Sequence, residues 1–270
     1  MRKLCLKIHR WLALPLGVVM TVLCFSGLAL LLFQDLAPLF DMNAKEIPLY
    51  TDIVRLHRWL FMKPENAHDG GLSLGRILTA VTSMCMVLVL LSGVVVWWPK
   101  SKKALKSRLT VSTNKGFRRF VYDSHVSLGI YVFIFLFLMA LTGPVFSFGW
   151  YRQGMSKLFG QPMPPKEMKA QLSKDGAKQG ETNEKAFAQP DTSKMKGQPQ
   201  AQKDGTKDMK GDQQGKKPKG GKLFKQLHTG SWGGWFSRVL YAIAAFIGGF
   251  LPISGYYLWW KRRSTKKRKA

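Results

Sequence analysis

The chain has 270 residues, of which 46% are hydrophobic, and a formal net charge of +27 at pH 7. The lysines and arginines gather beside long uncharged stretches, which excludes nucleic acid as the expected partner despite the high charge. The three cysteines, Cys5, Cys24 and Cys85, form neither a Cys-x-x-Cys-His sequence nor a paired framework, so covalent c-type haem and a disulfide scaffold are also excluded.

Four stretches contain no Asp, Glu, Lys or Arg: residues 11–33, 77–98, 126–150 and 239–260. At about 1.5 Å per residue, each covers the roughly 30 Å hydrocarbon layer of a bilayer. The first stretch is longer than a signal-peptide core and lacks a clear cleavage site, which favours a retained anchor. The sequence therefore predicts an all-α integral membrane protein with a bundle of four transmembrane helices, in contact with membrane lipid.

Charge outside these spans predicts how the chain is oriented. Basic clusters at residues 2–10, 100–119 and 261–269 favour the cytoplasmic side by the positive-inside rule, whereas the first loop, 34–72, is acidic. We therefore expect a multi-pass protein of the bacterial inner membrane with both termini in the cytoplasm. A long basic loop is still tolerated on the outer side, because long loops translocate largely regardless of charge.

The third loop differs in composition from the rest of the chain. Residues 162–221 consist mainly of Lys, Gln, Gly, Asp and Met and contain too few apolar residues to form a core. The sequence predicts a disordered extracytoplasmic loop there. The expected organisation is three spans in residues 1–150, the loop in 151–222, and the fourth span with a basic cytoplasmic tail in 223–270.

Two halves of the chain repeat the same features. His9 and His125 stand just before the first and third spans, and His57 and His228 lie upstream of the second and fourth. Each span also contains a Ser-Gly or Thr-Gly pair: Ser26-Gly27, Ser92-Gly93, Thr142-Gly143 and Ser254-Gly255. This repeat predicts two helical hairpins of similar design around a pseudo-symmetric interface.

Helix periodicity relates the glycines to the histidines. Eighteen residues make five turns, so Gly27 shares a face with His9, and Gly143 with His125, about 27 Å further along the axis. Such a helix can give an imidazole to a near cofactor and a side-chain-free patch to a far one. We expect the glycines of the second and fourth spans to give clearance in the same way. The alternative is that all four glycines simply allow close helix packing.

The histidines predict a metal or haem site. Neutral imidazole is a common ligand of both. Pairing would join His9 with His125 on the cytoplasmic side and His57 with His228 on the outer side. The alternative is four interfacial histidines without a ligand. Tetrahedral zinc is disfavoured because neither side offers four His or Cys residues.

Two arginines and the fifth histidine also bear on this prediction. Arg55 and Arg58 flank His57, so they could pair with haem propionates or simply be solvated at the interface. The fifth histidine, His68, fits an exposed turn. Nothing resembles a flavin, dinucleotide or ATP site.

Four segments stand out together: Lys7-Ile8-His9-Arg10-Trp11-Leu12, Arg55-Leu56-His57-Arg58-Trp59-Leu60, Ser92-Gly93-x-x-x-Trp97-Trp98-Pro99 and Leu227-His228-Thr229-Gly230. Their combined order resembles the PepSY-associated transmembrane helix family, which includes iron-regulated inner-membrane proteins and ferric-siderophore reductases. The resemblance implies a four-helix core and two b-type haems. It also implies their axial ligands: His9, His57, His125 and His228. Larger relatives carry a folded PepSY domain in a periplasmic loop, whereas this chain has short acidic and long basic loops instead.

The expected function is electron transfer across the membrane by two b-type haems. Electrons would come from a quinol or a cytoplasmic reductase and pass to an extracytoplasmic acceptor such as a ferric chelate or siderophore. The alternative is a non-catalytic PepSY-associated adaptor or regulatory protein without haem, whose Lys-rich loop binds an acidic partner. A metal-ion transporter is disfavoured, because the four predicted spans contain no Asp, Glu, Lys, Arg or His.

Overall fold

The computed structural model describes residues 1–62, 73–160 and 219–267, and the regular elements in those ranges are helices. His68 and residues 161–218 of the predicted loop lie outside the described residues. The chain forms two compact units, Met1–Met155 with Lys222–Ala270, and Ser156–Gly221. The candidate site residues all belong to the first unit.

Within the described residues, three helices are long and apolar enough to cross a membrane: α1 (Arg2–Leu36), α3 (Leu74–Trp97) and α10 (Gly234–Lys267). A fourth candidate is the pair α5 (Phe117–Tyr131) and α6 (Phe133–Thr142), which meet at a bend of 64°. The prediction of an all-helical protein with membrane-spanning helices is therefore confirmed. α1 continues through Pro15 without a break.

The third predicted span, 126–150, is not one straight helix. α5 and α6 are separated at Val132, and α6 gives way to a 3-10 turn, η4 (Gly143–Phe146), at the Gly143-Pro144 pair. Ser127 and Tyr131 both donate hydrogen bonds to Leu109 O, at 2.9 and 3.1 Å, and so hold the end of α5 against the end of α4 (Lys102–Leu109). α6 instead packs on α3 and α10, and the chain bends where these two sets of contacts meet.

Two short helices precede the second and fourth long helices. α2 (Pro48–Trp59) begins at a proline, which is favoured in the first helical turn, and ends at Leu60, where the backbone turns left-handed with a φ of 48°. α9 (Lys219–Thr229) leads into α10. A further helix, α7 (Gly149–Leu158), covers the first residues of the segment predicted as a loop.

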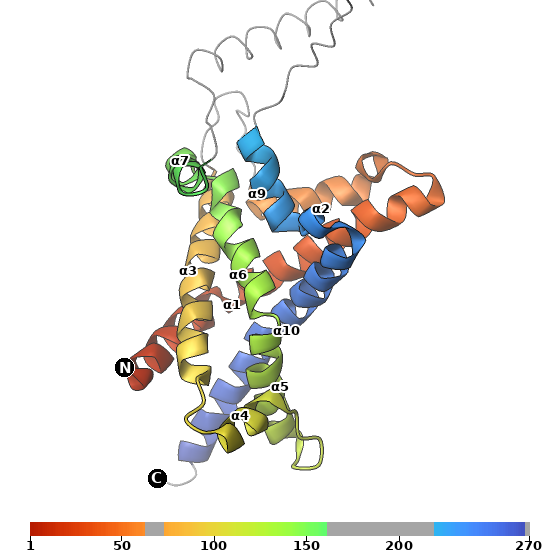
Figure 1. Cartoon of the computed structure of the whole chain (residues 1–270). Coiled ribbons are helices and arrows are strands. Elements are labelled where there is room, and N and C mark those ends of the chain that lie inside the picture. Colours follow the sequence, from red (N-terminus) through yellow and green to blue (C-terminus); the bar gives the residue numbers. More distant parts are fainter. Residues whose placement is uncertain (63–72, 161–218, 268–270) are drawn as a thin grey trace, which may run out of the picture. The chain divides into compact units, whose positions relative to one another are not determined.

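The long helices pack in a closed ring of neighbours. α1 contacts α3 and α10, and α6 contacts the same two helices; Figure 1 shows α3 and α6 running side by side. α2 and α9 lie at one end of this arrangement, and α4 lies at the other (Figure 1). A buried cluster of Val132, Leu136 and Ala244 forms a core between α6 and α10.

Small residues set the distance between α10 and its neighbours α1 and α6. A Cβ at Gly248 would lie 2.7 Å from Leu136 Cδ2 and 3.3 Å from Cys24 Sγ, and one at Gly17 would lie 2.9 Å from the ring of Tyr256. The hydroxyl of Tyr256 donates to the backbone of α1 at Leu14. Close approach through glycine is the usual way for helices to gain contact area in a membrane.

Candidate functional site

The four histidines predicted as ligands lie in two pairs. The rings of His9 on α1 and His125 on α5 have centroids 6.4 Å apart and planes at 90°. The rings of His57 on α2 and His228 on α9 have centroids 6.3 Å apart and planes at 59°. Each pair thus joins two helices that are far apart in the sequence, and the two pairs have nearly equal ring separations.

A hydroxyl group holds each of the four rings. The partner is always a Ser or Thr that precedes a glycine, in α1, α3 or α10 or at the end of α6, and it belongs to the same half of the chain. The hydroxyl oxygens lie 2.7–3.3 Å from the ring Nδ1 atoms in four pairs: His9–Ser92, His57–Ser26, His125–Ser254 and His228–Thr142.

These contacts decide which ring nitrogen carries the proton. Nδ1 of His9 also lies 2.9 Å from Val89 O, and Nδ1 of His228 lies 3.1 Å from Met139 O. A carbonyl can only accept a hydrogen bond, so Nδ1 must be the protonated nitrogen. His57 and His125 likewise have backbone hydrogen bonds, to Leu23 and Leu251, which again lie three residues before the hydroxyl residue.

The hydroxyl protons are used elsewhere, which strengthens the same assignment. Ser26 donates to Val22 O at 2.6 Å, and Ser92 donates to Val89 O at 2.9 Å. Thr142 and Ser254 donate in the same way to carbonyls of their own helices. The hydroxyl oxygens therefore accept from Nδ1–H, and Nε2 of each ring keeps its lone pair for a metal.

The predicted glycines lie against the imidazoles. A Cβ at Gly27 would lie 3.1 Å from Cε1 of His57, and one at Gly93 would lie 3.3 Å from Cε1 of His9. The corresponding distances are 3.7 Å for Gly255 to His125 and 3.9 Å for Gly143 to His228. Glycine at these positions leaves space for the ring that the neighbouring hydroxyl binds.

The ring separation fits a metal between two imidazoles. Metal–imidazole bonds are about 2.0–2.1 Å and a ring nitrogen lies roughly 1.1 Å from the ring centre, so a metal between opposed nitrogens gives centroids about 6.3 Å apart. Two opposed nitrogens leave the positions around the metal open for a planar macrocycle such as haem. Among the described residues, no group of three or more His, Cys, Asp or Glu could hold a metal ion. Each pair thus offers two imidazole donors, which could hold a metal along a single axis.

Comparison with known proteins agrees with the sequence motifs. A family model of the PepSY-associated TM region matches residues 44–262. The chain belongs to this family. The resemblance inferred from the sequence is thus confirmed, and the matched range contains His57, His125 and His228, while His9 precedes it. No curated protein and no solved structure matches the chain.

Burial keeps His57 and His228 of this PepSY-associated TM protein neutral. It is the main cause that lowers the pKa of both His57 and His228 to about 4, and for His57 the proximity of His228 contributes to the same shift. Both rings are therefore uncharged at pH 7. The uncharged imidazole is the form that binds a metal.

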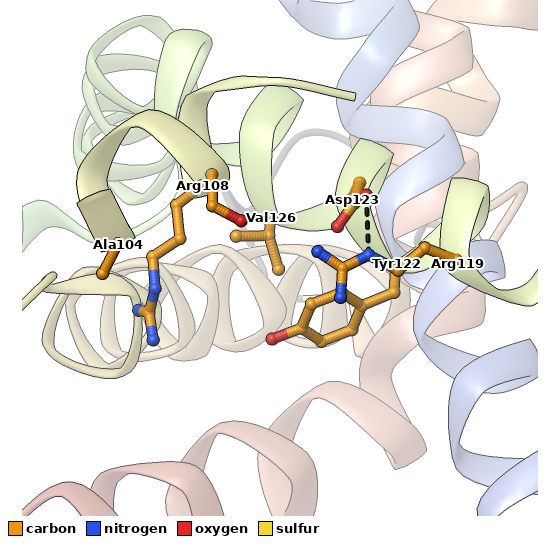
Figure 2. Close-up of a pocket in the computed structure, with 7 residues that line it drawn as sticks. Ala104, Arg108, Arg119, Tyr122, Asp123 and Val126 are labelled. Carbon is orange, nitrogen blue, oxygen red and sulfur yellow. Dashed lines mark hydrogen bonds and ion pairs between the residues drawn. The ribbon is translucent and has the colours of Figure 1, made fainter. Parts of the chain in front are cut away.

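A separate pocket of about 200 Å³ lies between α4 and α5 (Figure 2). Arg108 lines one side, and Tyr122 and the ion pair between Arg119 and Asp123 line the other, with Arg119 Nε 2.8 Å from Asp123 Oδ2. Val126, directly after His125, also contributes to its lining. The pocket therefore adjoins the helix segment that presents His125 but contains none of the four paired histidines.

The role of the hydroxyl residues was not predicted from the sequence. Ser26-Gly27 and its three counterparts were interpreted through their glycines, although a hydroxyl residue precedes the glycine each time. That fourfold repetition is the pattern that could have identified them.

Proposed function

We propose that this PepSY-associated TM protein transfers electrons across a membrane through two b-type haems. His9 and His125 would be the axial ligands of one haem, and His57 and His228 those of the other. The observation that carries the proposal is the matched geometry of the two pairs, in which half-buried rings 6.3–6.4 Å apart each have Nδ1 hydrogen-bonded. Haem supplies one-electron chemistry, and the protein supplies the ligands and their environment.

The proposed membrane arrangement is a four-helix bundle of two hairpins, with α5 and α6 acting as one broken span. The first hairpin would carry His9 and His57, and the second would carry His125 and His228. Each haem would then bridge the two hairpins, and each hairpin would hold its own imidazoles through its own hydroxyl residues. The basic flanks favour a bacterial inner membrane with both termini in the cytoplasm.

The positions along α1 support transfer from one side to the other. Ser26, the partner of His57, follows His9 by seventeen residues, which is about 26 Å of helix. The two pairs thus lie toward opposite ends of the spans. Electrons would enter from a quinol or a cytoplasmic reductase at the His9–His125 pair and leave from the His57–His228 pair to an outer acceptor such as a ferric chelate.

A reduced-minus-oxidised absorbance spectrum tests the proposal directly. The full-length protein, purified from haem-replete cells, is expected to show a Soret band and b-type bands corresponding to two haems per chain. The variant with all four paired histidines replaced by alanine provides the matched colourless control. A colourless wild-type protein would contradict the proposal and favour the adaptor without haem.

A second prediction concerns the hydroxyl residues. Ser26→Ala removes one acceptor from His57 Nδ1–H but leaves Leu23 O, so the haem should stay bound about 10-fold more weakly, as is typical when a hydrogen bond to a ligating histidine is lost. The potential of that haem should rise, because the imidazole becomes a poorer electron donor. Haem titration and a redox titration measure the two effects.

Ser26→Thr is the control for this variant. Thr142 holds His228 in the other half of the chain, so threonine should restore both haem affinity and potential. Equal behaviour of the Ala and Thr variants would show that the hydroxyl has no positioning role.

A further inference from the structure

Three arginines gather beside the His57–His228 pair. Arg58 directly follows His57 in α2, Arg76 lies in the first turn of α3, and Arg152 lies in α7. Arg58 and Arg152 both lie close enough to Arg76 to repel it, and Arg58 also acts electrostatically on His57. The three charges therefore share one region, although they come from three different helices.

Hydrogen bonds hold the side chains of Arg76 and Arg152 and the backbone of Arg58. Arg76 Nη2 donates to Phe146 O at 2.7 Å, and Arg152 Nε donates to Val145 O, also in η4, at 3.0 Å. The backbone carbonyl of Arg58 accepts from Thr79 Oγ1 at 3.3 Å, one turn after Arg76 on α3. The ring of Phe146 in turn lies 5.4 Å from the ring of His228. These contacts link the arginine cluster, defined as Arg58, Arg76 and Arg152, to both histidines of the pair.

No carboxylate neutralises the arginine cluster within the described residues. The ion pairs there join Arg55 to Asp52, Arg119 to Asp123 and Arg238 to Asp35. A guanidinium has five N–H donors, and the backbone contacts described above use one from Arg76 and one from Arg152. Like charges held together raise the local potential, and an anion that binds among them relieves the repulsion.

We propose that the arginine cluster is an anion site at the His57–His228 pair, which takes carboxylate or similar anionic oxygen groups. Arginine binds such groups through paired, charge-assisted hydrogen bonds. The inference rests on the proposed function, and the anion has two possible sources: the propionates of the haem held by this pair, or an anionic ferric chelate that receives its electron. Arg55 flanks His57 in the sequence as Arg58 does, but it does not belong to the cluster. Its Nη1 forms an ion pair with Asp52 Oδ1 at 3.3 Å.

The test compares two variants that each lose two positive charges. Arg58→Gln/Arg152→Gln removes the two exposed members of the cluster, and Lys45→Gln/Arg55→Gln removes two exposed charges outside it. Haem content is measured on the purified proteins. The rate of haem oxidation is measured in right-side-out membrane vesicles, with ferricyanide as the anionic oxidant and hexaammineruthenium(III) as the cationic one.

The two sources of anion give different results. If the anion is a propionate, the cluster variant falls from two haems per chain to about one, while the control variant keeps two. If the anion is an external chelate, the cluster variant keeps two haems. Its oxidation by ferricyanide then slows about 10-fold relative to the control, whereas its oxidation by hexaammineruthenium(III) does not slow.

The inference is overturned if the two variants match in haem content and in both oxidation rates. Failure of the anion site can be told apart from failure of the proposed function. A wild-type protein without haem contradicts the proposed function, whereas two matching variants that both carry haem contradict the anion site. The haem held by His9 and His125 serves as the folding check, since its absorbance should persist in both variants.

Discussion

Replacing His57 and His228 by alanine together is expected to remove one haem and leave the other. The two pairs lie toward opposite ends of α1, and each ring is fixed by its own hydroxyl and carbonyl partners. Loss of one pair therefore leaves the other pair intact. A pyridine haemochrome assay should show a fall from two haems per chain to about one, and electron delivery to an external acceptor should fall to background. His9→Ala/His125→Ala should lose the other haem.

A crossed variant makes this prediction specific to the pairing. His57→Ala/His125→Ala removes the same number of histidines but takes one from each pair, so both haems should be lost or reduced to weak, single-histidine ligation. His68→Ala, outside the described residues, serves as the control and should retain two haems. Equal haem loss in the paired and crossed variants would contradict the assignment of His57 to His228.

Gly75→Ala is expected to disrupt the junction that delivers His57. A Cβ at this position in α3 would overlap the carbonyl oxygen of Trp59 and lie 3.1 Å from Met62 Cβ. Since Trp59 O is a backbone atom, relief requires the end of α2 to move, and His57 lies only two residues earlier. We expect destabilisation by about 3 kcal/mol, typical of overpacking, together with loss of the haem at this pair. Thermal denaturation and haem content measure the two effects.

Gly154→Ala is the matched control for that substitution. It also adds a methyl group to a helical glycine, but nothing lies within 4 Å of the added Cβ. The variant should keep two haems and melt at or slightly above the wild-type temperature, because alanine favours helix more than glycine does. If Gly75→Ala behaves in the same way, the close contact between α2 and α3 does not position His57.

Much of the candidate site was predictable from local features of the sequence. The length of the uncharged stretches predicted membrane-spanning helices, because the thickness of a bilayer sets a length that can be counted. The repeated order of histidine, hydroxyl and glycine predicted two similar halves and supported the family assignment. The prediction was less accurate for the third span. No proline marks the end of α5 at Val132; the tertiary contacts of Ser127 and Tyr131 determine where it ends.

The tertiary structure alone decided which side chain meets which. Periodicity places Gly27 on the same face as His9, but the ring that actually contacts Gly27 belongs to His57 in another helix. Likewise, Arg58 and Arg76 come together only where α2 folds onto α3. The sequence by itself determined the membrane helices, the four histidines and their repeat, because length and spacing are properties of a single segment. The hydrogen-bond partners, ring separations and arginine cluster depend on how separate helices pack, which spacing along one helix does not specify.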